Sequence, residues 1–506
     1  MFALVIYHIL IHFSGKPKPN IRPKTQGEAF KLFITPDIVQ LILTETNREA
    51  DRKLTSKHEK RLQNDPNATR ESWKPLTEVE FWAFLGLVIH AGVQKQADVP
   101  IRELFLDGRA DPIYKATMSV NRFEEIKSFM RFDDRATREA RKAEMGKLAP
   151  IKQLFDLFLK NLCMPYEPNK ELTEDEQQFG FCGNCPVLQF NPSKPEKYGI
   201  KIFWICDAVN GYALNGKIYP GKENGVVSRD LGSKITKELA APFYNTGRVL
   251  TMDNFFTSLP LVEFLAERKL TVVGTIRNNK ADLPPEFKER RKRPLYSSAF
   301  AFRSKAMLVS YVAKSNKVVN LISSHHNSAL VDSGTKFKPQ VILYYNKTKI
   351  GVDLMNQKVA RYTTARTTRR WPMAAVYNLV DIAGANADII FEEVNPSGKL
   401  DHRRRFLKAL ALELTTPQMR ARMAANARLP ASIQNAMKEF GVEKDKVSSA
   451  ANHLLAPQAS VDVRIRCYRC TNDRKVQKLC QNCHSPVCNS HSRLVCEYCI
   501  EKADFS

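Results

Sequence analysis

The chain has 506 residues, and its 78 Lys and Arg against 53 Asp and Glu give a formal net charge of +25. This excess of cations points to a polyanionic partner, by default a nucleic acid, because Lys and Arg neutralise phosphates and release their counterions. With 43% hydrophobic residues the chain can bury roughly two to four cores, and the lack of an uninterrupted apolar run of about 20 residues argues against a membrane.

The periodicity of the apolar residues divides the first third of the chain. We interpret residues 1–24 as a leader of uncertain role. Their apolar start is not typical of a secretion signal, because it lacks the basic region and the small-residue cleavage site. Residues 25–170 repeat apolar positions at helical period. They therefore predict an all-helical part.

From residue 171 the pattern changes to short β-rich runs. An Asn210-Gly211 hairpin turn joins the first two of the predicted strands. The strands are predicted at 201–206, 213–219, 248–252 and 270–275, with a helix at 259–268 before the last of them. This order of strands and helix predicts an α/β core.

The remainder of the chain contains three kinds of segment, which differ in residue composition. A basic, β-rich stretch with strands predicted at 306–312 and 317–323 has the character of an insertion, and a helix is predicted from 353 to about 393. A small, polar stretch before the cysteines is typical of a linker. The predicted parts are a leader (1–24), a helical part (25–170), a first core part (171–277), an insertion (278–340), a second core part (341–362), a second helical part (363–447), a linker (448–464) and a cysteine-rich part (465–501).

The cysteine-rich part holds four pairs of metal-ligand residues. The pairs are Cys467-x2-Cys470, Cys480-x2-Cys483, Cys488-x2-His491 and Cys496-x2-Cys499. Thiolate and imidazole pairs at this spacing complete tetrahedral zinc sites from protein ligands alone, so they predict two structural Zn²⁺ ions. Disulfides are disfavoured, because nothing else in the chain indicates secretion.

The spacing further predicts a cross-brace, in which pairs one and three share one zinc ion and pairs two and four share the other. Zinc site 1 would consist of Cys467, Cys470, Cys488 and His491, and zinc site 2 of Cys480, Cys483, Cys496 and Cys499. Cross-braced modules serve as ubiquitin-ligase, histone-reading and DNA-reading modules. The pattern alone therefore leaves the partner of this module open.

Three carboxylates of the α/β part stand where divalent metals could be held. Strand alternation puts Asp175 on the opposite face from Glu174 and Glu176. Asp253 follows an apolar strand, and Asp353 begins a predicted helix. Two carboxylates on neighbouring strands and one on a helix can converge on two divalent ions about 4 Å apart, as in-line phosphoryl transfer requires. Helix capping is the competing interpretation, because an Asp in such positions also binds free N–H groups.

Five strings around these carboxylates have a distinctive residue order. They are Asp175-Glu-Gln177, Pro192-Ser-Lys-Pro-Glu-Lys-Tyr-Gly-Ile-Lys201, Met252-Asp-Asn-Phe-Phe-Thr-Ser258, Tyr345-Asn-Lys-Thr-Lys-Ile-Gly-Val-Asp353 and Arg370-Trp-Pro-Met373. In order and spacing they resemble the piggyBac transposase family and its domesticated derivatives. The resemblance extends from Phe13 to the end of the chain.

This resemblance implies an α/β ribonuclease-H-like catalytic core with a β-rich insertion, a flanking all-α domain for dimerisation and DNA binding, and a C-terminal cross-brace zinc module. It implies that Asp175, Asp253 and Asp353 are catalytic and hold two Mg²⁺ ions for DNA strand cleavage and transfer. Members of the family act at the ends of their element and at TTAA targets. Double-stranded DNA as partner, a homodimer that holds two ends, and a nuclear location are therefore expected.

Seven further residues are candidate DNA contacts. They are Lys194, Lys197, Tyr198, Lys201, Arg369, Arg370 and Trp371. The first four could direct charge at phosphates, or they could belong to an ordinary basic loop. Trp371 could stack on an unpaired base, or it could hold the start of a helix in the core.

The chain also departs from the family pattern. Phe181-Cys-Gly-Asn-Cys-Pro186 lacks two Arg that members usually carry there, and Asn356 replaces an acidic residue often found three places after the third Asp. These changes favour the alternative of a domesticated, catalytically silent DNA-binding derivative, whereas the intact Asp trio favours the enzyme. A ubiquitin ligase working through the cross-brace is disfavoured by the transposase strings.

Overall fold

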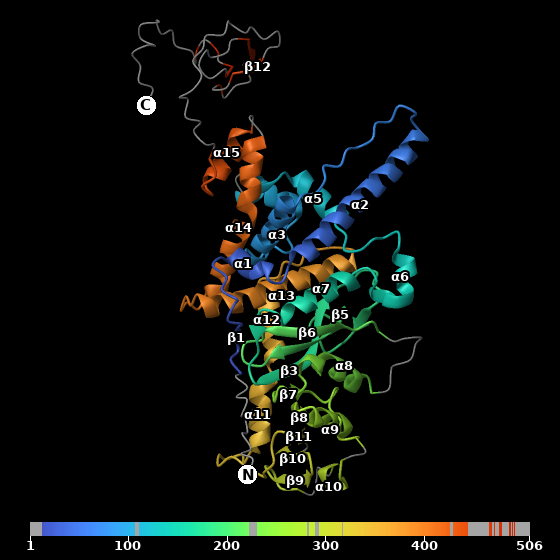
Figure 1. Cartoon of the computed structure of the whole chain (residues 1–506), viewed down its shortest axis with the longest axis vertical. Helices are drawn as coiled ribbons and strands as arrows, with labels where there is room; N and C mark the ends of the chain where they lie inside the picture. Colours follow the sequence, from blue (N-terminus) through green and yellow to red (C-terminus); the bar gives the residue numbers. More distant parts are fainter. Residues whose placement is uncertain are drawn as a thin grey trace, which may run out of the picture. The chain divides into compact units, whose positions relative to one another are not determined.

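A computed structural model divides the chain into two compact units, Met1–Glu443 and Lys444–Ser506 (Figure 1). The structure describes residues 13–106, 111–221, 230–280, 283–288, 293–315, 317–425 and 429–443, and in the second unit 465–467, 470, 475–477, 485, 486, 488 and 490. The predicted linker and five predicted zinc ligands lie outside the described residues. These ligands are Cys480, Cys483, His491, Cys496 and Cys499.

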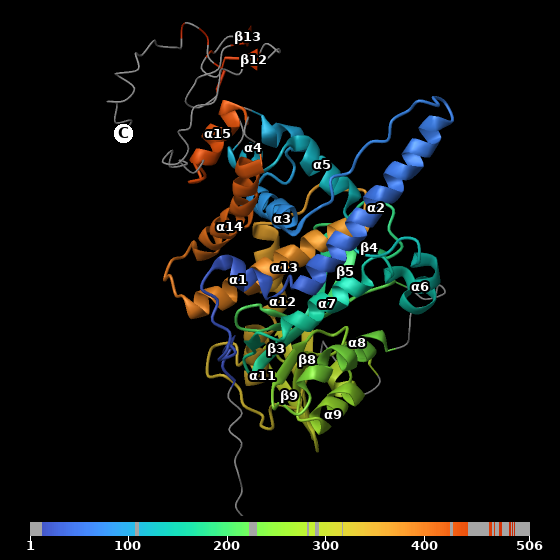
Figure 2. The same ribbon diagram turned by 45° about the horizontal axis from the view of Figure 1, so that its top comes forward.

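The helical part of the first unit combines segments from both ends of the chain (Figures 1 and 2). Helix α14 packs along α3, and Gly86 of α3 permits this close approach, since a Cβ there would lie 2.9 Å from the carbonyl oxygen of Ala411. The helices before the sheet are α1 (Gln26–Lys31), α2 (Pro36–Leu62), α3 (Glu78–Val93), α4 (Ile113–Thr117), α5 (Val120–Phe129), α6 (Arg138–Met145) and α7 (Lys152–Leu162). Those after it are α11 (Gln340–Thr348), α12 (Gly351–Arg361), α13 (Trp371–Val394), α14 (His402–Ala425) and α15 (Ala431–Lys438).

Two details of the helical prediction are wrong. The predicted helix 353–393 is divided into α12 and α13, because Pro372 in the first turn of α13 has no N–H to continue a helix. The connection is held instead by Asp381, which accepts hydrogen bonds from the backbone N–H of Thr364 (2.8 Å) and the hydroxyl of Thr363 (2.7 Å). In addition, the predicted helical part 25–170 contains a short strand, β2 (Tyr166–Glu167), which pairs with β1 (Lys16–Pro17) of the predicted leader.

A nine-stranded mixed sheet forms the other half of the first unit. The predicted hairpin is present, with Gly211 at φ 71° in the turn, a conformation that glycine adopts without strain. The strands are β3 (Glu171–Gly180), β4 (Leu188–Phe190), β5 (Tyr198–Asp207), β6 (Ala213–Ile218), β7 (Val249–Met252), β8 (Thr271–Thr275), β9 (Ser298–Arg303), β10 (Ala306–Lys314) and β11 (Lys317–Ser323). Their order is β4-β5-β3-β7-β8-β11-β10-β9, and β6 pairs with β5.

The directions of the strands divide the sheet into three segments. Strand β5 is antiparallel to β3, β4 and β6, whereas β7 and β8 run parallel to β3. Strands β9 to β11, from the region predicted as an insertion, form an antiparallel extension of the same sheet beyond β8. Strand β3 therefore lies in the interior of the sheet, with a partner on each side.

Helices cover both faces of the sheet. Helices α8 (Leu231–Ala240) and α9 (Leu259–Glu267) lie on one face, where Thr236 of α8 contacts Glu174 of β3. Helices α7, α12 and α13 lie on the other face, where Asn378 of α13 contacts Gln177 of β3. We call this second side the α12 face. A short helix, α10 (Pro285–Lys288), and the 3₁₀ turns η1 (Ile101–Phe105), η2 (Gly146–Leu148) and η3 (Ala241–Phe243) complete the described elements of the first unit. In the second unit, β12 (Ile465–Arg466) pairs antiparallel with β13 (Lys475–Val476).

The main hydrophobic core runs from the helical part into the sheet. Helix α13 lies within it. Among the described helices α13 alone is long and apolar enough to cross a membrane, but 89% of its most apolar stretch is buried inside the protein. Packing within the fold therefore accounts for its apolar character.

Candidate active site and zinc centre

Asp175 lies in β3, and Asp253 directly follows β7, the neighbouring parallel strand. Glu174 of β3 lies beside Met252, the last residue of β7, so the next residue of each chain segment is one of the two carboxylates. Strand β7 ends here, whereas β3 continues to Gly180. The two side chains therefore lie next to each other at the end of β7, beside the middle of β3.

A threonine cluster fixes the start of α12 above these strands. Thr173 of β3 donates a hydrogen bond to the carbonyl oxygen of Thr348 (2.5 Å), and the hydroxyls of Thr251 and Thr348 are 2.7 Å apart. Thr173 also accepts a hydrogen bond from the backbone N–H of Gly351 (3.3 Å). The end of α11 and the start of α12 are thus attached to two adjacent strands.

The same cluster shows which way the carboxylates point. Residues two apart in a strand share a face, so Asp175 and Asp253 follow Thr173 and Thr251 on the α12 face. Asp353 lies in the first turn of α12, immediately after the attached Gly351. The structure therefore places the three predicted residues around the junction of β3, β7 and α12, although among the described residues their carboxylate oxygens do not all lie within 4.8 Å of one another.

Glu174 confirms the predicted alternation along β3. Its carboxylate is buried on the opposite face, where it accepts a hydrogen bond from the hydroxyl of Thr236 (3.0 Å). Burial raises the pKa of Glu174 well above its ordinary value, and the negative charges of Asp175 and Asp253 raise it further. Glu174 is therefore best accommodated in its neutral form.

The electrostatics of the junction favour a bound cation. Burial, followed by the charges of Glu176 and Asp253, raises the pKa of Asp175 to about 7. Burial also raises the pKa of Asp253, although its hydrogen bond from the N–H of Phe255 opposes this shift. Carboxylates that repel one another in a buried site are stabilised by a positive charge between them.

The pKa of Tyr345 in α11 is affected by all three carboxylates. Its pKa is raised first by burial and then by the negative charges of Asp253, Asp175 and Asp353, while a hydrogen bond with Thr275 opposes the shift. One phenol therefore lies within electrostatic reach of the whole trio. Tyr345 belongs to a string that carries the family resemblance, but no pattern in the sequence indicated that its side chain faces the site.

The donor set suits Mg²⁺. All three side chains offer hard carboxylate oxygens, the ligand type that Mg²⁺ prefers. Asn356, one turn after Asp353 on α12, adds a buried Oδ1 without a hydrogen-bond partner among the described residues. A buried carbonyl oxygen without a partner is costly, and a cation or its water shell would satisfy it.

The capping alternative applies to the Asp residues in different degrees. Asp253 accepts a hydrogen bond from the N–H of Phe255 (2.7 Å), which forms a local turn, whereas the N-cap of α9 is Ser258. Asp353 is exposed in the first turn of α12, where its charge also favours the helix dipole. Metal binding and these local roles are compatible.

Among the candidate DNA contacts from the β4–β5 hairpin, Lys194 alone has a described contact next to the acidic site. Lys194 forms an ion pair with Glu176 (3.2 Å), the neighbour of Asp175. Lys197 and Tyr198 are exposed, and the ammonium group of Lys201 lies 5.7 Å from the ring centre of Phe203. Their role in binding DNA stays a prediction.

The candidates at the start of α13 have different surroundings. Trp371 is buried in the main core, which is the structural one of its two interpretations. Arg370 donates hydrogen bonds to the carbonyl oxygens of Lys127, Ser128 and Met130 at the end of α5. Only Arg369 is exposed. The first two side chains are therefore engaged within the protein.

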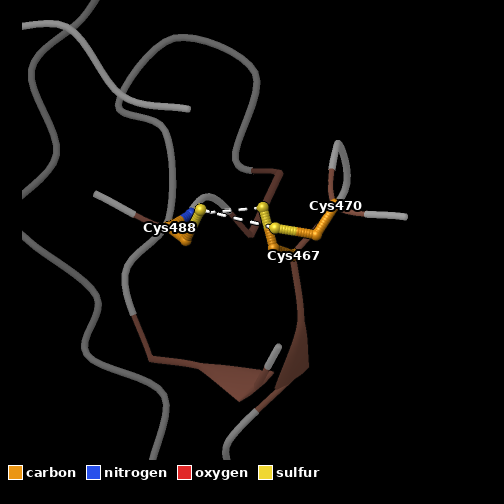
Figure 3. A group of neighbouring side chains, drawn as sticks. All are labelled: Cys467, Cys470 and Cys488. Atoms are coloured by element: carbon orange, nitrogen blue, oxygen red, sulfur yellow. Dashed lines mark hydrogen bonds between the residues drawn. The ribbon is translucent and has the colours of Figure 1, made fainter. Parts of the chain in front are cut away.

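In the second unit, three cysteine sulfurs from two of the predicted pairs lie together (Figure 3). The Sγ atoms of Cys467, Cys470 and Cys488 are all within 4.8 Å of one another. The N–H of Cys488 donates to Sγ of Cys467 (3.2 Å). Three convergent thiols fit the ligand chemistry of Zn²⁺, and they combine pair one with pair three, as the cross-brace requires. His491 and all of zinc site 2 lie outside the described residues.

Comparison with known proteins yields a family and several relatives. The model of the family described as Transposase IS4 matches residues 25–387. Human piggyBac transposable element-derived proteins 3 and 2 are 25% and 22% identical to the chain, over 71% of its length. The chain spans 60% of the length of each.

One solved structure matches almost the entire chain. It is a cryo-EM structure of a piggyBac transposase synaptic complex with hairpin DNA, with 32% identity and a TM-score of 0.78. The match covers 96% of this chain and 99% of that one. The chain therefore belongs to the Transposase IS4 family and, within it, to the piggyBac transposases and their derivatives.

Proposed function

We propose that this protein is a metal-dependent DNA transposase that cleaves and joins DNA strands at the ends of its element and at TTAA targets. The observation that carries the proposal is the junction of β3, β7 and α12. There the threonine cluster holds the start of α12 against the two strands that carry Asp175 and Asp253, with Asp353 in its first turn. Such a geometry suits two divalent ions.

The proposed chemistry assigns separate tasks to the side chains. Asp175, Asp253 and Asp353 would hold two Mg²⁺ ions, which when bound supply the charge for in-line attack on a phosphodiester. Arg277 lies close enough to lower the pKa of Asp253, and its Nε donates to Asn254 (2.9 Å), so its cation is positioned for a phosphate beside the site. Lys194 would serve the same purpose once DNA competes for it with Glu176.

The remaining parts of the proposal follow from the family. We assign the sheet from β3 to β8, with a hairpin on one side of β3 and two parallel strands on the other, to a ribonuclease-H-like core. Zinc would structure the second unit through two sites, for which the sulfur cluster of site 1 gives support. Double-stranded DNA, a homodimer that holds two ends and a nuclear location complete the proposal, and the net charge of +25 favours the first of these.

A second candidate is a derivative that binds DNA without cutting it. Cys182 and Asn184 stand where relatives usually carry Arg, and both are exposed, so the loop after β3 offers fewer cations to a phosphate. The human relatives are themselves described as transposable element-derived proteins. This candidate predicts DNA affinity without metal-dependent cleavage.

Cleavage of labelled DNA separates the two candidates. The purified chain is incubated with the genomic sequence that flanks its coding region, with and without Mg²⁺. For the transposase we expect Mg²⁺-dependent nicking that falls at least about a hundredfold in Asp253→Ala, because even loss of a residue that supports a metal ligand costs about 10- to 100-fold.

The matched control for this experiment is Asp156→Ala, which changes a half-exposed surface carboxylate of α7. It should nick like the parent protein, and both variants should keep their affinity for DNA. Tight binding without nicking by the parent protein would establish the silent derivative instead.

A further inference from the structure

Two exposed aromatic rings form a pair at the edge of the sheet. The centroids of Phe190 in β4 and Tyr198 in β5 are 4.9 Å apart, with 43° between the ring planes. Phe190 is 59% exposed and Tyr198 is 50% exposed, although large apolar side chains gain from burial. We call them the aromatic pair.

The aromatic pair lies on the same face of the sheet as Asp175. Asp175 is beside Trp204 of β5, and Tyr198 is 204 − 198 = 6 residues earlier in that strand. An even separation keeps both side chains on the α12 face, and Phe190 is the register partner of Tyr198. At about 3.3 Å per residue, the pair lies roughly 20 Å along the strands from the acidic site.

A cation adjoins the aromatic pair in the chain. Lys197, directly before Tyr198, is exposed. It has no ion-pair partner in the part of the chain that the structure describes. The carboxylate of Glu196 lies on the other face of the sheet, next to Gly180. The surroundings of the two rings are therefore suited to a polyanion.

We propose that the aromatic pair is a stacking site for unpaired bases of the DNA strand that leads to the acidic site. Stacking platforms flanked by cations are typical of single-stranded nucleic acid sites. A duplex hides the faces of its bases, so the rings would select unpaired nucleotides. At about 3.4 Å per stacked nucleotide, roughly 20 Å places these bases about six steps from the cut.

This inference rests on the proposed function for its location but can be tested without cleavage. Binding of a fluorescent oligothymidylate and of a duplex of equal length is measured without added Mg²⁺, so that Mg²⁺-dependent chemistry plays no part. We expect Phe190→Ala and Tyr198→Ala each to weaken single-strand binding about tenfold. Duplex binding should change less than about twofold, because its phosphate contacts remain.

Two further variants make the test specific. Phe302→Ala removes a ring of similar exposure, 56%, from β9 at the opposite edge of the sheet, and it should leave both affinities unchanged. Phe190→Trp, unlike Phe190→Ala, should bind the single strand about as tightly as the parent protein, because indole also stacks on bases.

Fluorescence of Tyr198→Trp gives a direct readout of stacking. Relative to the parent protein, its added emission should be quenched by oligothymidylate and not by the duplex. Unchanged single-strand affinity in both alanine variants would overturn the inference, as would equal losses for the single strand and the duplex. A change of oligomeric state without loss of single-strand affinity would identify the pair as a contact between copies of the chain and overturn it as well.

Discussion

Buried acidic side chains in this protein behave differently according to their neighbours. Asp175 is surrounded mainly by other carboxylates, and its pKa rises to about 7. Glu49 of α2 is buried too, but Arg131 (2.8 Å), Arg52 (2.8 Å) and Arg135 (3.5 Å) surround its carboxylate. Burial alone would raise the pKa of Glu49, yet the hydrogen bond from Arg52 and the charges of Arg131, Arg52 and Lys53 hold it at about 2.

The ion pairs of Glu49 predict a pH-dependent stability. Its pKa is about 2 in the folded chain against 4.5 without its partners, so its ionised form stabilises the fold above about pH 4.5 and loses this effect as the pH falls towards 2. Glu49→Gln should therefore lower the free energy of unfolding at pH 7 by about 3 kcal/mol, because Arg131 stays buried without its counter-charge. Denaturant unfolding between pH 7 and pH 3 measures the difference.

The difference between parent and Glu49→Gln should shrink below about pH 4.5, where the parent protein loses its advantage. Glu59→Gln, an exposed change on the same helix, serves as the control and should be neutral throughout. A destabilisation that stays constant across this range would show that Glu49 acts through packing rather than charge.

At the scale of elements, the position of α12 depends on a glycine at its start. A Cβ on Gly351 would lie 2.7 Å from Oγ1 of Thr173 and 2.8 Å from the carbonyl oxygen of Asp207. The second contact is with backbone, which cannot rotate away. Helix α12 can therefore approach β3 this closely only without a side chain at residue 351, and Asp353 is two residues further on.

Gly351→Ala should consequently displace the start of α12 and with it Asp353. We expect a loss of about 1–3 kcal/mol in the free energy of unfolding from overpacking. If the chain is an active nuclease, we also expect Mg²⁺-dependent nicking to fall up to about a hundredfold, since a shift of about 1 Å can cost that much. Thermal unfolding and the nicking rate are the measurements.

Gly384→Ala in α13 is the matched control. Its new Cβ would meet only Cδ2 of Leu407 at 3.3 Å, the flexible end of a side chain, and alanine favours a helix interior over glycine by roughly 0.5–1 kcal/mol. This variant should be neutral or slightly stabilised. If Gly351→Ala were equally well tolerated, the close approach of α12 to β3 would not determine the geometry of the site.

The elements also show what the sequence could and could not predict. Apolar runs and the Asn210-Gly211 turn predicted β5 to β8 because their signals are local. Strand β3, rich in Glu and Gln, was harder to delimit, because it is held by partners on both sides that lie far along the chain. The break after α12 depends in part on Asp381, which binds residues 17 and 18 positions before it.

For the site, the family strings predicted which three carboxylates to consider, but not how they are brought together. The hydrogen bonds of Thr173 and Thr251 to Thr348 join residues 175 and 97 positions apart, and threonine has no spacing rule that would reveal such pairs. The burial of Trp371 was likewise open, because an exposed and a buried Trp look alike in a sequence. Tertiary contacts decided both.

On the scale of the whole molecule, hydrogen bonds join residues near the two ends of the first unit's chain. Glu413 of α14 accepts hydrogen bonds from the hydroxyl of Thr25 (2.7 Å) and from the N–H of Gly27 (2.8 Å) at the start of α1. Asn395 donates to the carbonyl oxygen of Pro23 (3.1 Å). Since these contacts stay within residues up to 443, the first unit should not depend on the second for its stability.

Zinc should therefore affect the second unit alone. Full-length protein purified without chelators should contain two zinc ions per chain by metal analysis, and Cys488→Ser should contain one, because it removes a sulfur from the cluster of Cys467, Cys470 and Cys488. The main thermal transition, which reports on unfolding of the first unit, should not move.

Cys182→Ser, a change of an exposed cysteine outside the cluster, is the control and should leave the zinc content and the main transition unaltered. An unchanged zinc content in Cys488→Ser would remove this residue from the zinc ligands, and a main transition lowered by several degrees would show that the two units unfold together.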